Sequence, residues 1–242
     1  MNCKMYDWVE KSIEEYYQPV KVLKKDDKKE IALYQHREGG ESVIVKRLNH
    51  KSLVYERLAT IEHYNIVKVL EAASNDTSTT VIEEYLYGVS VADLLVNKRL
   101  SQKAAYQIIL QVCDGLEILH GNEIIHRDIK PENVFVLQDG SVKIMDFDAS
   151  RIYRKDENKD TVALGTIGYA PPEQYGEAQT DARSDIYALG VLMNVMFTGK
   201  HPVNEVAKGR IGTIIEKCIM VNQNKRYRNV SEIKEQLKKL TY

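Results

Sequence analysis

A carboxylate, an ammonium and a side-chain amide lie close together in the segment HRDIKPEN at residues 126–133. Asp128 is followed by Lys130 and then by Asn133. A carboxylate can accept a hydroxyl proton, and an ammonium can neutralise the charge of a moving phosphate, while an amide oxygen can ligate a hard cation. This combination of residue types indicates phosphoryl transfer.

Two other segments carry residues that suit the same chemistry. Asp146 begins an Asp-Phe-Asp segment directly after a β-prone run, and a carboxylate there can hold Mg²⁺ against two phosphates of a nucleotide. Lys46 ends a Val-Ile-Val-Lys run, from which its ammonium can meet phosphates. Surface charge would explain any one of these segments alone, so the inference rests on their joint occurrence.

In their order along the chain, these segments resemble the motifs of the eukaryotic-like Ser/Thr protein kinases, in a small form that looks bacterial. Residues 165–173 end in Pro-Pro-Glu and resemble the family's segment ending in Ala-Pro-Glu. Residues 184–190 are similar to the buried helix whose aspartate braces the catalytic loop. Arg226 resembles the partner of Glu173. The resemblance covers roughly residues 15–240.

The resemblance implies ATP and Mg²⁺ as cofactors and a role for each motif residue. Asp128 would be the base that orients the substrate hydroxyl, and Lys130 would neutralise the γ-phosphate. Asn133 and Asp146 would hold Mg²⁺. Lys46 would bind the α- and β-phosphates.

The resemblance also implies a set of residues around the adenine ring. Glu84 and Leu86 would offer backbone groups to its polar edge. The apolar residues expected to sandwich the ring are Leu23, Ile31, Ile44 and Phe135.

In the family, the lysine also pairs with a glutamate on the helix of the small lobe. Glu56 is the expected partner of Lys46, although it follows the lysine so closely that the helix over 53–62 must be short. Glu62 is the competitor, but it falls at the expected helix end. Glu83 occupies the position that guards the back of the adenine pocket, where a charged group needs a partner or water.

Two threonines precede the Pro-Pro-Glu segment. Thr161 is the expected phosphorylation site of the activation loop, because Arg127 resembles the arginine that binds such a phosphate. The alternative is that Thr161 is an ordinary exposed threonine. Thr166 is expected to contact Asp128 and Lys130, the arrangement of Ser/Thr-specific kinases.

The chain departs from the family pattern at two further places. Residues 24–29 read Lys-Lys-Asp-Asp-Lys-Lys where the family has a glycine-rich loop, whose backbone amides approach the phosphates. Either this is a plain exposed turn with weaker ATP affinity, or the lysine ammoniums replace the amide contacts. Asp148 replaces the glycine of Asp-Phe-Gly, and it either tunes the metal or stabilises the local turn.

Hydrophobic periodicity and turn signals predict the elements that position these residues. We expect strands first and helices later, which is an α+β pattern. The resemblance implies the bilobal protein kinase fold, with a small β-rich N-lobe carrying one short helix and a larger helical C-lobe. The expected domains are an N-terminal helical extension (1–18), the N-lobe (19–86) and the C-lobe (87–242). The expected helices are 5–17, ended by Pro19, 51–62 and 101–120, and the expected strands are 20–23, 31–36, 43–48, 66–70, 79–85, 134–137 and 142–145.

Composition excludes several other classes of protein. The 242 residues carry 34 Lys and Arg against 35 Asp and Glu, a net charge of −1, which gives no electrostatic case for nucleic acid. Three distant cysteines fit neither a disulfide framework nor a zinc site. The longest apolar stretch, residues 186–197, is too short to span a bilayer, and no signal peptide is visible. We therefore expect a cytoplasmic protein without a membrane partner.

The sequence thus predicts an ATP- and Mg-dependent Ser/Thr protein kinase that transfers the γ-phosphate to protein hydroxyls and autophosphorylates in its activation loop. The alternative is a pseudokinase that acts as a nucleotide- or protein-binding regulatory module, which the glycine-free loop favours. A small-molecule kinase is disfavoured, because such enzymes typically have His-Gly-Asp at the catalytic loop. The expected partners are a protein substrate and a separate regulator, and the N-terminal helix either braces the small lobe or binds a partner.

Overall fold

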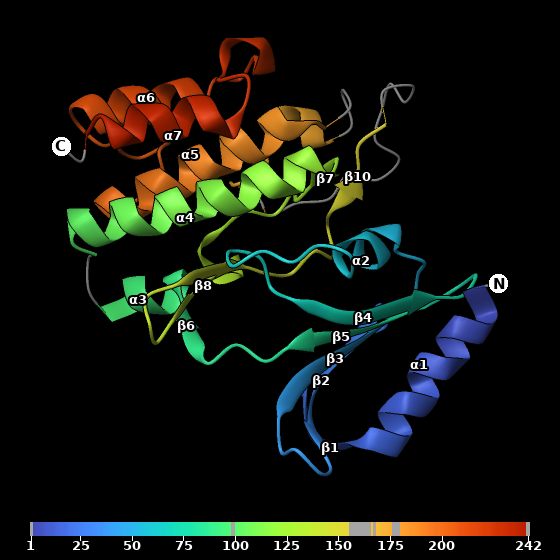
Figure 1. Cartoon of the computed structure of the whole chain (residues 1–242). Helices are drawn as coiled ribbons and strands as arrows, with labels where there is room; N and C mark the ends of the chain where they lie inside the picture. Colours follow the sequence, from blue (N-terminus) through green and yellow to red (C-terminus); the bar gives the residue numbers. More distant parts are fainter. Residues whose placement is uncertain (1, 98–99, 155–165, 167, 176–179, 241–242) are drawn as a thin grey trace. The chain divides into compact units, whose positions relative to one another are not determined.

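The computed structural model describes residues 2–97, 100–154, 166, 168–175 and 180–240 of the chain. Helices and strands are both present in quantity, so the expected α+β class is confirmed (Figure 1). In the described part of the chain, no helix is long and apolar enough to cross a membrane.

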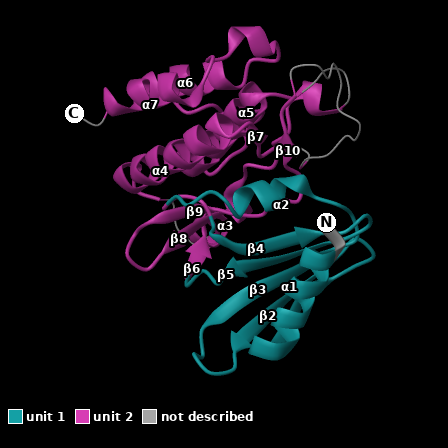
Figure 2. Ribbon diagram, turned by 45° about the vertical axis from the view of Figure 1, so that its right-hand side comes forward, with its two compact units in different colours: residues 1–63, 67–87 teal, residues 64–66, 88–242 magenta. Residues whose placement is uncertain are grey.

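The chain divides into two compact units (Figure 2). The N-terminal unit comprises residues 1–63 and 67–87, and the C-terminal unit comprises residues 64–66 and 88–242. The division after residue 87 lies next to the one expected after residue 86.

The N-terminal unit is built on a five-stranded antiparallel sheet with the strand order β1-β2-β3-β5-β4 (Figure 1). One helix precedes the sheet and a second lies between β3 and β4. The bounds are α1 Asn2–Tyr16, β1 Tyr17–Lys25, β2 Lys29–His36, β3 Ser42–Leu48, α2 Leu53–Leu58, β4 Val69–Ser74 and β5 Thr79–Glu84.

The register of this sheet separates polar chemistry from apolar packing. Side chains alternate between the two faces of a strand, and directly paired residues share a face. Lys46 pairs with Ile31, and Ile44 pairs with Glu83, so these four side chains share one face. The other face is covered by α1, in a buried cluster of Val9, Ile13, Val43, Val45, Ala73 and Ile82.

Polar contacts fix α1 to this second face. The guanidinium of Arg47 on β3 donates from Nη2 and Nε to the carboxylate of Glu10, at 2.9 and 3.0 Å. The hydroxyl of Thr80 on β5 donates to the same carboxylate. The N-terminal segment therefore braces the sheet of its own unit.

Three sequence-predicted elements of this unit have other bounds. The helix α1 ends at Tyr16, and Pro19 lies inside β1, an edge strand where a missing N–H is tolerated. The expected helix over 51–62 is reduced to the six residues of α2. The expected strand over 66–70 begins only at Val69.

The C-terminal unit is mainly helical, with two small sheets. The central helix α4 begins after Ser101, whose hydroxyl accepts a hydrogen bond from the Ala104 amide, and it buries an apolar stripe. The order in the three-stranded sheet is β6-β8-β9, and β10 pairs with β7. The bounds are β6 Gly88–Ser90, α3 Val91–Asn97, α4 Gln102–Gly121, β7 Ile124–Ile125, η1 Pro131–Asn133, β8 Val134–Leu137, β9 Val142–Ile144, β10 Arg151–Ile152, η2 Pro172–Tyr175, α5 Ala182–Thr198, α6 Arg210–Cys218, η3 Gln223–Lys225 and α7 Val230–Lys238.

Candidate active site

The loop after β7 is held in place by a buried aspartate on α5. Asp185 is fully buried, and its carboxylate accepts hydrogen bonds from the backbone amides of His126 and Arg127 at 2.9 and 2.8 Å. His120 Nε2 lies 2.8 Å from the same carboxylate. Burial alone would raise the pKa of Asp185, but the contacts with His120 and His126 outweigh it and hold the pKa below its ordinary value. The bracing role expected for this helix is confirmed.

The backbone of this loop adopts an unusual conformation at Arg127. Its φ angle is +67°, which costs a non-glycine residue about 1–3 kcal/mol unless the surroundings impose it. The surroundings do so from both sides, because Asp185 accepts the amide of Arg127 and Gln174 Nε2 donates to its carbonyl at 2.6 Å. Gln174 was not predicted as a site residue, although it directly follows Glu173 of the Pro-Pro-Glu segment.

The strained backbone leads into a compact polar network around Asp128. Lys130 Nζ lies 2.7 Å from Asp128 Oδ2. The side-chain amide of Asn133 donates to both Oδ2 and the backbone carbonyl of Asp128, each at 2.9 Å. The three residues that the sequence singled out in this loop are therefore brought together.

Thr166 completes the network from a distant part of the chain. Its hydroxyl donates to Asp128 Oδ1 at 2.6 Å and accepts from Lys130 Nζ at 2.8 Å. The expected contacts of Thr166 with both residues are confirmed. An ammonium, a carboxylate and a hydroxyl held at hydrogen-bond distance form a site that can orient a second hydroxyl and accept its proton.

Asp146 follows β9 and is the second carboxylate of the C-terminal unit that the sequence singled out. Its φ is +65°, again outside the usual range for a non-glycine residue. Its Oδ1 atom is buried and has no hydrogen-bond partner among the described residues. An unpartnered buried carboxylate oxygen is costly unless a cation or donor arrives, so this oxygen fits a metal ligand.

The amide of Asn133 suits the same ion. Its nitrogen is committed to Asp128, so its oxygen is the atom left for a cation. Among the described residues, no cluster of three or more His, Cys, Asp or Glu side chains is arranged to hold a metal. Two oxygen ligands are what Mg²⁺ needs when substrate phosphates and water complete its shell.

His126 is a buried histidine with both ring nitrogens engaged. Nδ1 accepts from the Asp128 amide at 3.3 Å, and Nε2 lies 3.2 Å from the Met145 carbonyl. These contacts fit the neutral ring with its proton on Nε2, because Nδ1 must stay an acceptor. Burial lowers the pKa of His126. The ring also packs on Phe147, with centroids 4.9 Å apart, and so ties the two motif segments together.

Arg127 carries a second chemical feature in its side chain. The residue is only 6% exposed. Burial, and next the nearby positive charge of Arg151, lower the pKa of Arg127 to about 10. The positive charge of Arg151 next to the buried guanidinium of Arg127 makes a place where an anion is stabilised.

The Pro-Pro-Glu segment is anchored by a buried ion pair. Arg226 donates from Nη1 and Nη2 to the two carboxylate oxygens of Glu173, at 2.5 and 3.0 Å. Ser184 on α5 donates to Glu173 as well, at 3.1 Å. The predicted partnership of Arg226 with Glu173 is confirmed.

In the N-terminal unit, Lys46 forms a buried ion pair that the sequence analysis did not predict. Its Nζ lies 3.0 Å from Glu83 Oε2 and donates to the Tyr55 hydroxyl at 3.2 Å. The ion-pair partner of Lys46 is Glu83, whereas Glu56 was the expected one. The reason is local, because α2 turns the buried ring of Tyr55 toward the lysine while Glu56 stays partly exposed.

The residues expected around adenine are found in two groups. Ile31 and Ile44 lie on the same face of the sheet as Lys46, and Leu23 is half-exposed at an irregularity of β1. Glu84 ends β5 and its carboxylate accepts the Lys68 amide at 2.7 Å. The remaining two are Leu86, which follows β5, and Phe135, which lies on β8 of the C-terminal unit.

The glycine-free segment forms a tight turn between β1 and β2. The Asp26 carboxylate accepts the amides of Lys28 and Lys29 at 2.9 and 3.0 Å. These hydrogen bonds to backbone amides lower the pKa of Asp26. In a glycine-rich loop, such backbone amides bind phosphate, whereas here they donate to Asp26.

Two further residues that the sequence singled out are Asp148 and Thr161. Asp148 lies in a turn closed by a hydrogen bond from the Ser150 amide to the Phe147 carbonyl, at 3.0 Å. Thr161 lies outside the described residues, so its role stays a prediction.

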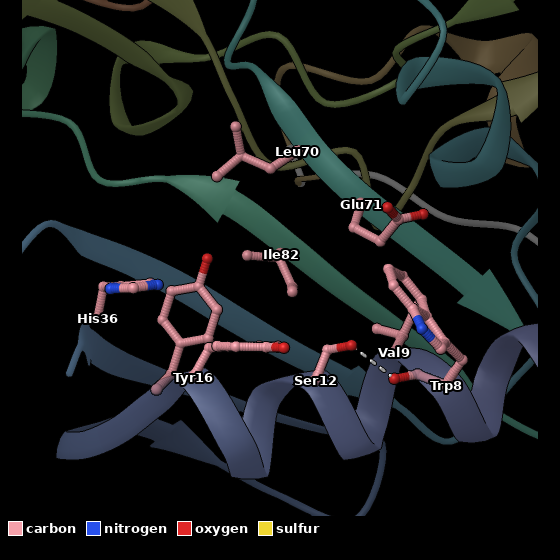
Figure 3. A pocket seen from close by; sticks show the side chains of 9 residues that line it. Trp8, Val9, Ser12, Tyr16, His36, Leu70, Glu71 and Ile82 are labelled. Atoms are coloured by element: carbon pink, nitrogen blue, oxygen red, sulfur yellow. Dashed lines mark hydrogen bonds between the residues drawn. The ribbon is translucent and has the colours of Figure 1, made fainter. Parts of the chain in front are cut away.

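A hollow of about 270 Å³ lies beside α1 in the N-terminal unit (Figure 3). Its wall combines aromatic side chains of α1 with residues of β4 and β5, and the Ser12 hydroxyl donates to the Trp8 carbonyl at 2.9 Å. It contains none of the residues expected to bind ATP. Its lining residues are Trp8, Val9, Ser12, Tyr16, Tyr17, His36, Leu70, Glu71 and Ile82.

Comparison with known proteins shows the family of the chain. The family model of the protein kinase domain matches residues 4–242, nearly the whole chain. The chain therefore belongs to the protein kinase family, as the sequence motifs indicated.

Three of the curated relatives are named as serine/threonine-protein kinases. A probable serine/threonine-protein kinase of Clostridium perfringens is 33% identical over 75% of this chain and 27% of its own length. Serine/threonine-protein kinase A of Synechocystis is 34% identical over 68% of this chain and 37% of its own length. The serine/threonine-protein kinase PknB of Mycobacterium tuberculosis is 30% identical over 75% of this chain and 34% of its own length. The chain thus spans about a third of the length of these relatives.

Proposed function

We propose that the protein is an ATP- and Mg-dependent kinase that phosphorylates serine and threonine hydroxyls of proteins. The network of Asp128, Lys130, Asn133 and Thr166 carries this proposal. It joins residues 38 positions apart in the chain through contacts of 2.6–2.9 Å. A surface charge cluster does not need such a network, whereas a site that orients a hydroxyl does.

The proposed reaction transfers one phosphoryl group and one proton. The substrate hydroxyl lies against Asp128, whose carboxylate accepts the hydroxyl proton as the oxygen forms a bond to the γ-phosphorus of ATP. The bond between this phosphorus and the β–γ bridging oxygen breaks, and ADP leaves with the electron pair. The Lys130 ammonium neutralises negative charge on the moving group, and Thr166 keeps both side chains aligned.

Asn133 and Asp146 are the residues that would hold the metal. The unpartnered Asp146 Oδ1 and the uncommitted Asn133 oxygen support this assignment. Bound Mg²⁺ supplies charge neutralisation at the phosphate oxygens.

We also assign the nucleotide to the residues that resemble the ATP site of the family. Lys46 takes the phosphates, and the backbone groups of Glu84 and Leu86 take the adenine edge. The apolar residues Leu23, Ile31, Ile44 and Phe135 take the faces of the ring.

Autophosphorylation at Thr161 is part of the same proposal. Arg127 and Arg151 support it, because a dianion nearby would offset the unfavourable effect of the Arg151 charge on the buried guanidinium of Arg127. A phosphate on Thr161 would thereby gain cationic partners next to the loop that carries Asp128. The cytoplasmic location, the protein substrate and a separate regulatory partner remain predictions from the sequence.

One observation favours the second candidate function, a pseudokinase that binds a nucleotide or a protein without transferring phosphate. The turn between β1 and β2 uses the amides of Lys28 and Lys29 for Asp26, which weakens the case for phosphate binding there. The motif residues that transfer needs are nevertheless all present, so active transfer is the better supported function.

The experiment that separates the two functions uses ATP labelled on the γ-phosphate. The protein is incubated with labelled ATP and Mg²⁺, alone and with a generic protein substrate, next to an Asp128→Ala variant. We expect label on serine or threonine of the wild type and at least a 10²-fold slower reaction of the variant. Nucleotide binding without Asp128-dependent transfer in either setting would identify the pseudokinase.

A further inference from the structure

The ion pair of Lys46 and Glu83 is among the most buried polar contacts of the N-terminal unit. Both side chains are nearly inaccessible, with 3% and 2% of their surface exposed. Charges at such a depth lose their hydration, and only a close partner of opposite sign offsets the loss. Each residue therefore needs a partner where it lies.

The sheet itself sets the geometry of this pair. Glu83 on β5 stands directly opposite Ile44 on β3, and Lys46 is the next residue of β3 on the same face. The two side chains are thus diagonal neighbours on adjacent central strands, within reach of long side chains. Strands joined by a continuous ladder of hydrogen bonds hold the Glu83 carboxylate at a fixed place.

The helix α2 contributes a different residue from the one the sequence predicted. Tyr55 is fully buried, and its hydroxyl accepts a hydrogen bond from Lys46 at 3.2 Å. Glu56, its neighbour, has no hydrogen bond or ion pair within the described residues. The helix α2 has only six residues, and its Tyr55 is in contact with Lys46 through both the hydroxyl and the ring.

We propose that Glu83 is the positioning residue for Lys46 in the kinase reaction, and that Glu56 has no part in it. This inference rests on the proposed function, since it assigns Lys46 to the ATP phosphates. The glutamate that orients the lysine then lies on a central strand of the sheet. The carboxylate that orients Lys46 is consequently built into the sheet, and α2 adds only the neutral hydroxyl of Tyr55.

The test compares carboxylate-to-amide changes at three glutamates. Glu83→Gln removes the charge but keeps the shape, Glu56→Gln tests the competing helix residue, and Glu71→Gln is a matched control on the α1 side of the same sheet (Figure 3). Steady-state kinetics are measured over a range of ATP concentrations, with a thermal unfolding curve for each variant.

We expect Glu83→Gln to lower kcat/KM for ATP by about 10²-fold, the cost of a misplaced catalytic group. Glu56→Gln and Glu71→Gln stay within about twofold of the wild type. The proposal is overturned if Glu83→Gln stays within about threefold of the wild type, or if Glu56→Gln is the more damaging change.

Glu83→Gln leaves Lys46 buried without an anionic partner, so it is open to a loss of folding. Glu83→Asp answers this, because it keeps the charge and shortens the side chain by one methylene. We expect Glu83→Asp to unfold within a few degrees of the wild type while kcat/KM for ATP falls about tenfold or more. An Asp variant with wild-type kinetics would count against the proposal.

A double-mutant cycle shows whether Glu83 acts through Lys46. In a Lys46→Met background, Glu83→Gln is expected to change the residual transfer rate by less than about twofold, because its target is gone. A loss of the same size as in the wild-type background would mean that Glu83 acts by another route, and would refute the inference.

Nucleotide binding separates this inference from the proposed function. If the wild type binds ATP but transfers no phosphate, the proposed activity fails. Calorimetry then decides the inference, which expects weaker ATP binding by Glu83→Gln but not by Glu56→Gln. Equal affinities of the two variants would overturn it, and a wild type that neither binds nor transfers would contradict both proposals.

Discussion

The hydroxyl of Thr166 donates a hydrogen bond of 2.6 Å to Asp128 Oδ1 and accepts one of 2.8 Å from Lys130. A threonine from the segment before η2 thereby fixes Asp128, the proposed proton acceptor, and Lys130, which is proposed to neutralise the charge of the phosphate. Thr166 is itself the second residue of the segment that leads into Pro-Pro-Glu, so the ion pair of Glu173 with Arg226 supports the same arrangement.

The Thr166 contacts predict a loss of rate when the hydroxyl is removed. Thr166→Val keeps the side-chain shape, removes the hydroxyl, and leaves Asp128 and Lys130 to pair without their bridge. We expect kcat to fall about tenfold or more, because one charge-assisted hydrogen bond contributes about 1.5–3 kcal/mol. Thr166→Ser restores the hydroxyl and is the control. A valine variant with wild-type kcat would show that the bridge is irrelevant to the reaction.

The ion pair of Arg226 with Glu173 predicts a large effect on stability. Arg226→Ala leaves a buried carboxylate without its partner, so the free energy of unfolding falls by about 3–5 kcal/mol. At this chain length, each kcal/mol corresponds to about 2–4 °C in the melting temperature. Thermal unfolding measures the change. Lys200→Ala, which breaks the exposed pair with Glu205, is the control and costs less than about 1 kcal/mol. Equal shifts in both variants would contradict the assignment.

The neutral ring of His126 predicts a pH dependence of stability. Burial lowers the pKa of His126 in the folded protein, and the nearby carboxylates of Asp185, Asp128 and Asp146 only oppose this. Above about pH 6.5 the ring is neutral in both states, and as the pH falls below this value the unfolded state takes up the proton first. The ring therefore lowers stability on acidification, by at most about 1.4 kcal/mol per pH unit.

Urea unfolding of His126→Phe at several pH values between about 5 and 7.5 tests this dependence. Phenylalanine keeps the contact with Phe147 but does not titrate, so the variant loses stability less steeply on acidification than the wild type. The unfolding free energy of the wild type minus that of the variant should therefore decrease as the pH falls. If this difference stays constant or increases on acidification, the ring is not held neutral.

Packing of α1 on the sheet predicts that the N-terminal segment contributes to stability. Ile13 is 1% exposed in the cluster with Val43, Val45 and Ile82, so Ile13→Ala costs about 2–5 kcal/mol of unfolding free energy. Met5 on the same helix is 52% exposed, and Met5→Ala changes stability by less than about 0.5 kcal/mol. Chemical denaturation measures both. Similar small effects at the two positions would show that α1 does not brace the sheet.

The site residues of the C-terminal unit were the easiest to predict from the sequence. Asp128, Lys130 and Asn133 lie within one short loop, so local spacing alone places them together. Their contact with Thr166 was expected only through the family resemblance, because no local pattern joins residues so far apart. Gln174 escaped notice since its role, holding the Arg127 carbonyl, depends on a backbone conformation that residue types do not reveal.

The N-terminal unit shows where sequence reasoning fails. The helical pattern over 51–62 is longer than α2, and propensity does not say which turn of a short helix faces the sheet. Glu56 looked like the partner of Lys46 for this reason, whereas strand register placed Glu83 there. Register between β3 and β5 is a tertiary property, set by the packing of both faces, and the sequence showed only that a charge at position 83 needs a partner.

The most direct test of the central claim is the rate of phosphoryl transfer by Asp128→Asn. This change keeps the shape of the side chain, and its amide oxygen can still accept a hydrogen bond from Thr166. It removes the carboxylate that accepts the proton. Phosphate incorporation into serine and threonine is followed by mass spectrometry, with ATP and Mg²⁺ and with EDTA in place of Mg²⁺. The account predicts Mg-dependent transfer by the wild type and a loss of about 10²–10⁴-fold in the variant. Transfer at the wild-type rate by Asp128→Asn would contradict it.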